Sequence, residues 1–158
     1  MSRINFTLIF AGWLLLPCPT IAQIIPDSTL GGSNSQVLPE TINGIPSERL
    51  AGGAVRGSNL FHSFQEFNVN SGRGAYFDNP QGITNIFSRI TGNNPSNILG
   101  TLGVLGNANL FLINPKGIVF GPEARLDLRG SFFATTADSV VFDNGFEFSA
   151  SNTQNPIL

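Results

Sequence analysis

Residues 109–122, NLFLINPKGIVFGP, join two short apolar runs through a turn sequence, and this unit restricts the local fold more than any other segment. The tetrad NPKG at 114–117 suits a type I β-turn. Asn at the first position bonds to nearby backbone, Pro at the second has a preset φ, and Gly at the fourth relieves crowding. The runs at 110–113 and 118–120 are apolar and uncharged, which is typical of strands with little exposed face. The segment therefore predicts a strand–turn–strand unit that contains no catalytic side chain.

Similar short apolar runs recur along the chain and are separated by Gly, Asn or Pro. They lie at residues 75–77, 110–113, 118–120, 126–128, 132–134, 140–142 and 146–148. From residue 110 onward their starts are six to eight residues apart, a spacing that predicts an all-β domain. Residues 125–129, RLDLR, alternate between charged and apolar, which favours a strand with its apolar side chains turned inward.

Two further segments, 60–67 and 83–90, have apolar residues at the spacing of a helix. The residues at this spacing are Leu60, Phe64 and Phe67 in one segment, and Ile83, Ile86, Phe87 and Ile90 in the other. Both segments are rich in β-branched and aromatic residues and contain few strong helix formers. We therefore predict that both are strands.

Residues 1–22 have the pattern of a Sec signal peptide. Arg3 is followed by an apolar core at 8–16, and small residues stand at Thr20 and Ala22 before Gln23. The apolar core is too short to span a bilayer as an ordinary helix. We therefore expect the Sec machinery to export the chain.

Removal of residues 1–22 leaves 136 residues with no cysteine and a net charge of −3, from seven Lys and Arg against ten Asp and Glu. Such a domain is large enough to bury a core and must be stable without disulfides. The basic residues are scattered and the net charge is negative, so nucleic-acid binding is not expected. The chain also lacks a basic amphipathic helix, so we expect no stable membrane insertion.

His62 is the only histidine, and we expect it to lie at the surface or to line a turn. Ser63 is adjacent in sequence, but neighbours along a strand point to opposite faces and so do not form a catalytic pair. One histidine without cysteine or an acidic cluster does not make a metal site. We expect neither a metal nor another cofactor.

The turn sequence NPKGI at 114–118 resembles the NPNGI-type motif of the two-partner secretion domain found at the N-terminus of filamentous haemagglutinin-like exoproteins. NPSNI at 94–98 resembles the second signature of this family, of NPNL or NPSxL type. The resemblance continues through LFHSFQEFNV at 60–69, FSRITG at 87–92 and GSFFATTADSVVF at 130–142. The sequence departs from the family pattern at Lys116, where Asn or Ser is usual, and at Ile98, where Leu is usual. The residues that carry the two signatures are Asn94, Pro95, Asn97, Ile98, Asn114, Pro115, Gly117 and Ile118.

The spacing of the strands alone leaves a sandwich and a solenoid open. Asn94 and Asn114 are twenty residues apart, a plausible coil length in which equivalent asparagines stack. The resemblance implies a right-handed parallel β-helix with additional strands capping its N-terminal end. Residues 154–158 read as the approach to another strand, so we expect residues 23–158 to be a secretion domain that is incomplete at its C-terminal end.

By the same resemblance, the chain is a secretion-targeting and fold-nucleating domain and not an enzyme. The family's domains are recognised in the periplasm by the POTRA domains of a partner outer-membrane β-barrel transporter, which implies a secreted or cell-surface protein. The Asn-Pro motifs either contact this transporter or only form the turns that let coils stack. Two alternatives stay open: a non-functional fragment of a longer exoprotein gene, and a β-helix carbohydrate-active enzyme. The acid–base pair of such an enzyme would be Glu123 with Asp127, or Asp138 with Asp143.

Overall fold

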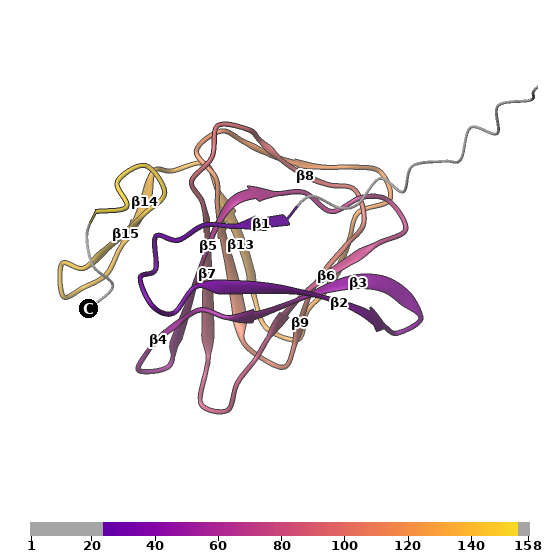
Figure 1. The fold of residues 1–158 in the computed structure, drawn as a ribbon, viewed down its shortest axis with the longest axis horizontal. Coiled ribbons are helices and arrows are strands. Elements are labelled where there is room, and N and C mark those ends of the chain that lie inside the picture. Colours follow the sequence, from indigo (N-terminus) through magenta and orange to yellow (C-terminus); the bar gives the residue numbers. More distant parts are fainter. Residues whose placement is uncertain (1–23, 155–158) are drawn as a thin grey trace, which may run out of the picture.

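The computed structural model describes residues 24–154, and all its regular elements in this range are β-strands. The strands of successive coils stack in parallel (Figure 1) and enclose an apolar interior. This arrangement is a β-solenoid, so the predicted all-β parallel β-helix is confirmed. The signal peptide predicted at residues 1–22 lies outside the described residues.

Three parallel sheets form the sides of the solenoid. The first sheet contains β5 (Asn59–Phe67), β7 (Asn85–Ile90), β10 (Asn109–Ile113) and β13 (Phe132–Thr135). The second contains β3 (Ile45–Gly52), β6 (Gly74–Asp78), β9 (Thr101–Leu105) and β12 (Arg125–Asp127). The third is short and contains β8 (Ser96–Ile98) and β11 (Ile118–Phe120), with Val69 bridging to Ile98. Each coil runs from the first sheet through the third to the second, and β13 begins a fourth passage.

The register of the first sheet gives the coil length. Asn59 pairs with Asn85, Asn85 with Asn109, and Leu110 with Phe132, so successive coils advance by 26, 24 and 22 residues. The expected coil of about twenty residues, based on Asn94 and Asn114, is therefore wrong. The coil length varies from one coil to the next because the segments that connect the strands differ in length.

A different set of asparagines stacks along the solenoid. The side-chain amide of Asn85 donates to Asn59 Oδ1 at 3.0 Å, and the amide of Asn109 donates to Asn85 Oδ1 at 3.0 Å. Asn109 Oδ1 in turn accepts the backbone N–H of Ser131 at 2.8 Å. This ladder satisfies amide groups at the start of each strand and keeps the coils in register.

The edge of the first coil is covered by antiparallel strands, as predicted for an N-terminal cap. β1 (Ile24–Pro26) and β4 (Ala54–Arg56) both pair with β5. β2 (Ser35–Ile42) forms a hairpin with β3 and extends the second sheet. Because these strands occupy the hydrogen-bonding groups at this end, parallel stacking stops there.

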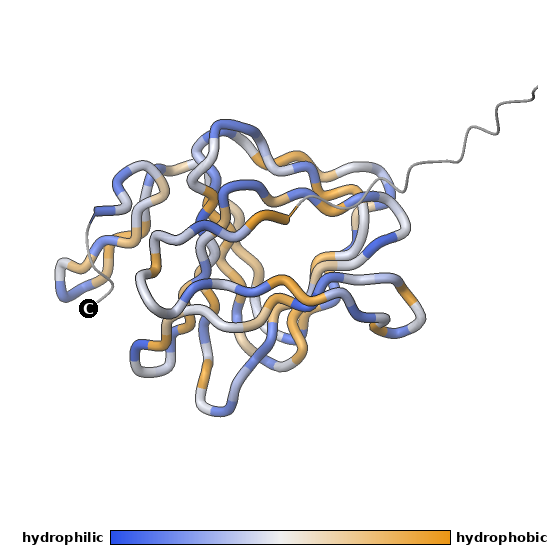
Figure 2. Tube along the Cα trace, in the orientation of Figure 1, coloured by the Kyte–Doolittle hydropathy of each residue, from blue (hydrophilic) through white to orange (hydrophobic). Residues whose placement is uncertain are grey.

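The interior of the solenoid is a set of stacked apolar side chains. Leu60, Ile86 and Leu110 lie directly above one another in the first sheet, and each is at most 1% exposed. Figure 2 shows the short spacing of apolar residues along the coils that produces this core. Both segments with helical spacing lie in or beside strands β5 and β7, which confirms the strand prediction. Their composition therefore outweighed their spacing.

The outer face of the first sheet carries a column of phenylalanines. Phe61, Phe87, Phe111 and Phe133 stack with ring centroids 5.3, 4.5 and 4.8 Å apart. After β13 the chain forms the antiparallel hairpin β14 (Ser139–Val141) and β15 (Glu147–Ser149). The hairpin covers Phe61 with three further aromatic rings, from Phe142, Phe146 and Phe148. A second apolar cluster thus lies between the outer face of the first sheet and the β14–β15 hairpin. Figure 1 shows this hairpin outside the coils.

The predicted alternation in residues 125–129 is confirmed for the side to which the apolar side chains point, but not for their burial. Leu126 pairs with the fully buried Leu102 and faces the same side, yet it is 49% exposed. The reason is that no described strand lies over β12 on its far side. A side chain that faces the interior is buried only when the next coil covers it.

Candidate functional site

The two Asn-Pro motifs lie together at the corner between the first and third sheets. Residues 91–95, here called the first turn, connect β7 to β8, and residues 114–117, the second turn, connect β10 to β11 one coil later. β8 and β11 pair in parallel with Ser96 opposite Ile118, so the two turns lie on adjacent coils. The corner and the strands that follow it bring together all eight signature residues: Asn94, Pro95, Asn97, Ile98, Asn114, Pro115, Gly117 and Ile118.

Asn114 is fully buried and joins the two turns. Its Nδ2 donates to the carbonyl oxygen of Asn94 at 3.1 Å and to Ser96 Oγ at 3.0 Å. Its Oδ1 accepts the backbone N–H of Lys116 at 2.9 Å. Both polar atoms of this side chain are therefore engaged inside the protein, and neither is presented to a partner.

The backbone of the second turn closes as the sequence predicts. The N–H of Gly117 donates to the carbonyl of Asn114 at 3.0 Å, the bond that defines a β-turn. Gly117 has φ of 116°, which residues with a side chain rarely adopt. Its carbonyl accepts the N–H of Ser96 at 3.0 Å, so the glycine also links the turn to the coil below.

The first turn presents its side chains to solvent. Asn94, Pro95 and Asn97 are exposed. Asn94 Nδ2 donates to Glu66 Oε1 at 2.7 Å, and Asn97 Nδ2 donates to Asn68 Oδ1 at 3.3 Å. Water can replace these exposed bonds at little cost, so the first turn can offer amide groups to another molecule.

Ile98 and Ser96 complete the corner from inside. Ile98 is 0% exposed and packs in the core, while Ser96 is equally buried and accepts from Asn114. Sequence reasoning did not identify Ser96 as a partner of Asn114. The available signal was a small hydroxyl residue between two asparagines at the start of a strand, where an apolar residue is usual.

The expectation that His62 lies at the surface or lines a turn is wrong. It is 0% exposed on β5, and its ring packs against Phe77 with centroids 5.2 Å apart. Nδ1 lies 2.9 Å from Ser35 Oγ, whereas Nε2 has no hydrogen-bond partner in the described residues. Burial lowers the pKa of His62 to about 4, and Asp78 opposes this only in part. The imidazole is therefore neutral and is enclosed by the N-terminal cap strand β2.

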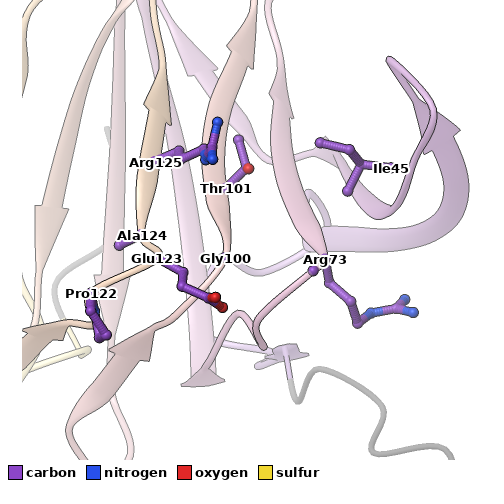
Figure 3. Close-up of a pocket in the computed structure, with 9 residues that line it drawn as sticks. Ile45, Arg73, Gly100, Thr101, Pro122, Glu123, Ala124 and Arg125 are labelled. Carbon is purple, nitrogen blue, oxygen red and sulfur yellow. The ribbon is translucent and has the colours of Figure 1, made fainter.

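The carboxylates of the enzyme alternative have separate partners. Glu123 accepts from Ser71 and lines a cleft of about 430 Å³ between β9, β12 and the tip of the β2–β3 hairpin (Figure 3). Asp127 does not line this cleft, and its Oδ2 accepts from the Tyr76 hydroxyl at 3.1 Å. In the other pair, Asp138 accepts from Ser151 Oγ at 2.7 Å, and Asp143 lies in the exposed turn of the β14–β15 hairpin.

The described residues contain no group of three or more His, Cys, Asp or Glu side chains suited to hold a metal ion. In the same range, no helix reaches the length and hydropathy that a membrane span requires.

Two comparisons relate this chain to known proteins. The family model of the TPS secretion domain matches residues 22–158. The heme/hemopexin-binding protein of Haemophilus influenzae is 31% identical over 75 residues, which is 48% of this chain and 8% of that protein. The chain thus covers a small part of the length of this relative. Because the family model extends over nearly all of it, the chain belongs to the TPS secretion domain family.

Proposed function

We propose that this chain is the secretion domain of an adhesin- or haemagglutinin-like exoprotein and targets it to a partner outer-membrane β-barrel transporter. The observation that carries the proposal is the family match over residues 22–158. Residues 1–22 would act first, as a Sec signal peptide that delivers the chain to the periplasm. The POTRA domains of the transporter would then recognise the domain, and the product would be secreted or held at the cell surface.

The proposed recognition precedes folding. An extended chain offers unpaired N–H and C=O groups along its future strands, and a receptor can bind these by β-augmentation. Folding outside the cell then buries the ladders of Leu60, Ile86 and Leu110 and makes return through the pore unfavourable. Export would in this way gain direction without ATP.

The same geometry supports a role in starting a longer solenoid. The cap strands β1, β2 and β4 occupy the edge of the first coil. On the far side of β11, β12 and β13 no strand pairs within the described residues. Parallel strands supplied by the exoprotein could add to these edges, so the domain would act as a template for coil formation.

The proposal does not include heme or hemopexin binding. The Haemophilus relative is a heme/hemopexin-binding protein, but the similarity covers 8% of its length. Export, and not ligand binding, is the function that a shared secretion domain would carry. A catalytic role has less support, because Glu123 and Asp127 are engaged with different partners, Ser71 and Tyr76.

The test is export of the full chain into the medium, with and without its partner transporter. Four proteins are compared: wild type, Asn94→Ala with Asn97→Ala, Asn114→Ala, and the control Asn107→Ala. Asn107 is an exposed asparagine at the corner between β9 and β10, on a different edge of the coil. We expect export of the wild type and the control to depend on the transporter.

The variants separate the two roles of the Asn-Pro motifs. If the Asn94 and Asn97 side chains contact the transporter while the chain is still extended, the double variant folds like the wild type but is exported less. If the motifs only form turns, export falls for Asn114→Ala alone, together with stability. Retention of the wild type in the periplasm despite its transporter would contradict the proposal, and circular dichroism of the retained protein would then tell an unfolded chain from a folded domain with another role.

A further inference from the structure

One arginine side chain is buried on the outer face of the first sheet and not in the interior of the solenoid. Arg89 of β7 is 1% exposed although it carries a full charge. Its Nε donates to Ser63 Oγ on the neighbouring strand β5 at 2.9 Å. A buried guanidinium needs several partners to replace its lost hydration, so the source of the other partners is informative.

One set of partners comes from the N-terminal segment, residues 24–34. Arg89 Nη2 donates to Thr29 Oγ1 at 2.8 Å. The carboxylate of Asp27 accepts from the Thr29 hydroxyl at 2.7 Å, from Ser63 Oγ at 2.8 Å and from Thr91 Oγ1 at 2.6 Å. Burial alone would raise the pKa of Asp27, but these hydrogen bonds hold it below its usual value, so the carboxylate stays charged opposite the arginine.

The other set comes from the C-terminal hairpin. Arg89 Nη1 donates to the backbone carbonyl of Ser149 at 2.8 Å, and its guanidinium carbon lies 4.6 Å from the centre of the Phe148 ring. Leu30 of the N-terminal segment belongs to the same apolar cluster as Phe148 and Ala150. Both segments therefore bond to the Arg89 guanidinium and contribute to one apolar cluster, although they lie at opposite ends of the described chain.

We propose that Arg89 is a latch that couples the N-terminal segment to the β14–β15 hairpin. Neither segment alone supplies all the acceptors that the buried guanidinium uses, because Nη2 donates to Thr29 and Nη1 donates to Ser149. Each segment therefore seats fully only when the other is in place. The cap of the solenoid is completed only after residues about sixty positions beyond Arg89 have joined it. This inference concerns the fold itself and does not rest on the proposed export function.

Reciprocity makes the latch testable. If the seating of two segments is coupled, the loss of either one weakens the seating of the other by the same factor, and a partial disturbance of either one is felt at the other. Hydrogen exchange of the full chain reads both ends separately. The amides of Asp27 and Thr29 report on the N-terminal segment, and those of Phe142 and Ala150 report on the hairpin.

Two variants disturb one end each and leave residue 89 itself unchanged. Gly145 has φ of 79° in the hairpin turn with open space around it, so Gly145→Val strains only this turn. Thr29→Val is nearly isosteric and removes one oxygen that bonds to Arg89. We expect Gly145→Val to lower protection of Asp27 and Thr29, and Thr29→Val to lower protection of Phe142 and Ala150, each by about tenfold, as is usual for coupled sites.

The chain offers a matched control for the glycine. Gly44 has φ of 78°, is also surrounded by open space and lies in the β2–β3 turn. Gly44→Val should therefore leave the amides of Asp27 and Thr29 unchanged. Arg89→Lys keeps the charge but loses the forked donors, and we expect it to lower protection at both ends. If Gly145→Val affects only the hairpin and Thr29→Val only the N-terminal segment, the two ends seat independently and the latch is refuted.

Discussion

The two Asn-Pro turns have similar sequences and lie on adjacent coils, yet they differ in how their asparagines are used. The Asn114 side chain is 0% exposed and bonds to Asn94, Ser96 and Lys116. The Asn94 side chain is exposed and donates to Glu66. The same residue type therefore holds the coils together in one turn and faces solvent in the other. Similarity of motif does not imply similarity of role.

The difference follows from which part of each asparagine meets the neighbouring coil. Asn94 contributes its backbone carbonyl to the contact, and Asn114 contributes its side chain. A buried amide that loses its partners pays the full cost of desolvation, whereas an exposed one bonds to water instead. Substitutions at single positions can therefore separate the two roles.

The largest effect is expected for Asn114→Ala. The change removes three hydrogen bonds and leaves the Asn94 carbonyl and Ser96 hydroxyl without their donor. We expect the free energy of unfolding to fall by about 3 kcal/mol, measured by urea denaturation. The control is Asn107→Ala, at an exposed corner, which should change stability by less than about 0.5 kcal/mol. Equal losses for the two variants would contradict the buried role of Asn114.

Asn114→Asp distinguishes lost hydrogen bonds from lost volume. The carboxylate has the same size and can still accept from the Lys116 N–H, but it cannot donate to the Asn94 carbonyl. We expect a loss at neutral pH comparable with that of Asn114→Ala. A stability close to that of the wild type would mean that packing, and not donation by Nδ2, holds the two turns together.

The next effect is expected at Gly117, where the backbone and not a side chain is tested. An Ala at φ of 116° is strained, although its Cβ would meet Pro95 only at an ordinary distance of 3.6 Å. We expect Gly117→Ala to cost about 2 kcal/mol. Gly32 is the matched control, because its surroundings are open and its φ is not in the left-handed region. If thermal unfolding gives Gly117→Ala and Gly32→Ala the same melting temperature, the glycine at position 117 does not relieve backbone strain.

Much of the fold was predictable because its signals are local. The turn at 114–117 depends on Asn, Pro and Gly at fixed positions, and the short apolar runs depend on residues next to each other in sequence. The coil length was not predicted from Asn94 and Asn114, because these two residues are not equivalent in register. The better signal was a triplet that begins three of the four strands of the first sheet: NLF at 59–61, NIF at 85–87 and NLF at 109–111.

The burial of His62 and Arg89 was not predictable from their neighbours in sequence. His62 lies on β5 and Arg89 lies on β7, and the residues that cover their side chains come from distant segments of the chain. Ser35 of β2 meets His62, and residues of the N-terminal segment and the hairpin meet Arg89. A polar residue within an apolar strand is compatible with an exposed face or with a covered one, and only the tertiary fold decides between them.

A small effect on stability is expected for the exposed side of the comparison. Asn94→Ala removes the bond to Glu66 but keeps the backbone carbonyl that accepts from Asn114. We expect a loss of at most about 0.5 kcal/mol in urea denaturation, because water replaces the exposed bond. The same protein is informative in the export assay, since any defect there cannot be assigned to unfolding. If Asn94→Ala lowers the free energy of unfolding as much as Asn114→Ala does, the two asparagines have the same structural role.

The smallest effect is expected for Lys116→Asn, which introduces a residue usual for the related motif. Lys116 is exposed, and its contribution to the turn is the backbone N–H that donates to Asn114 Oδ1. Asn keeps this N–H and is well suited to a turn, so stability should change by no more than about 0.3 kcal/mol. Urea denaturation at low and high salt checks this result. A salt-dependent loss well above that value would show that the ammonium group itself stabilises the turn, and the second motif would then present a functional side chain of its own beside the buried Asn114.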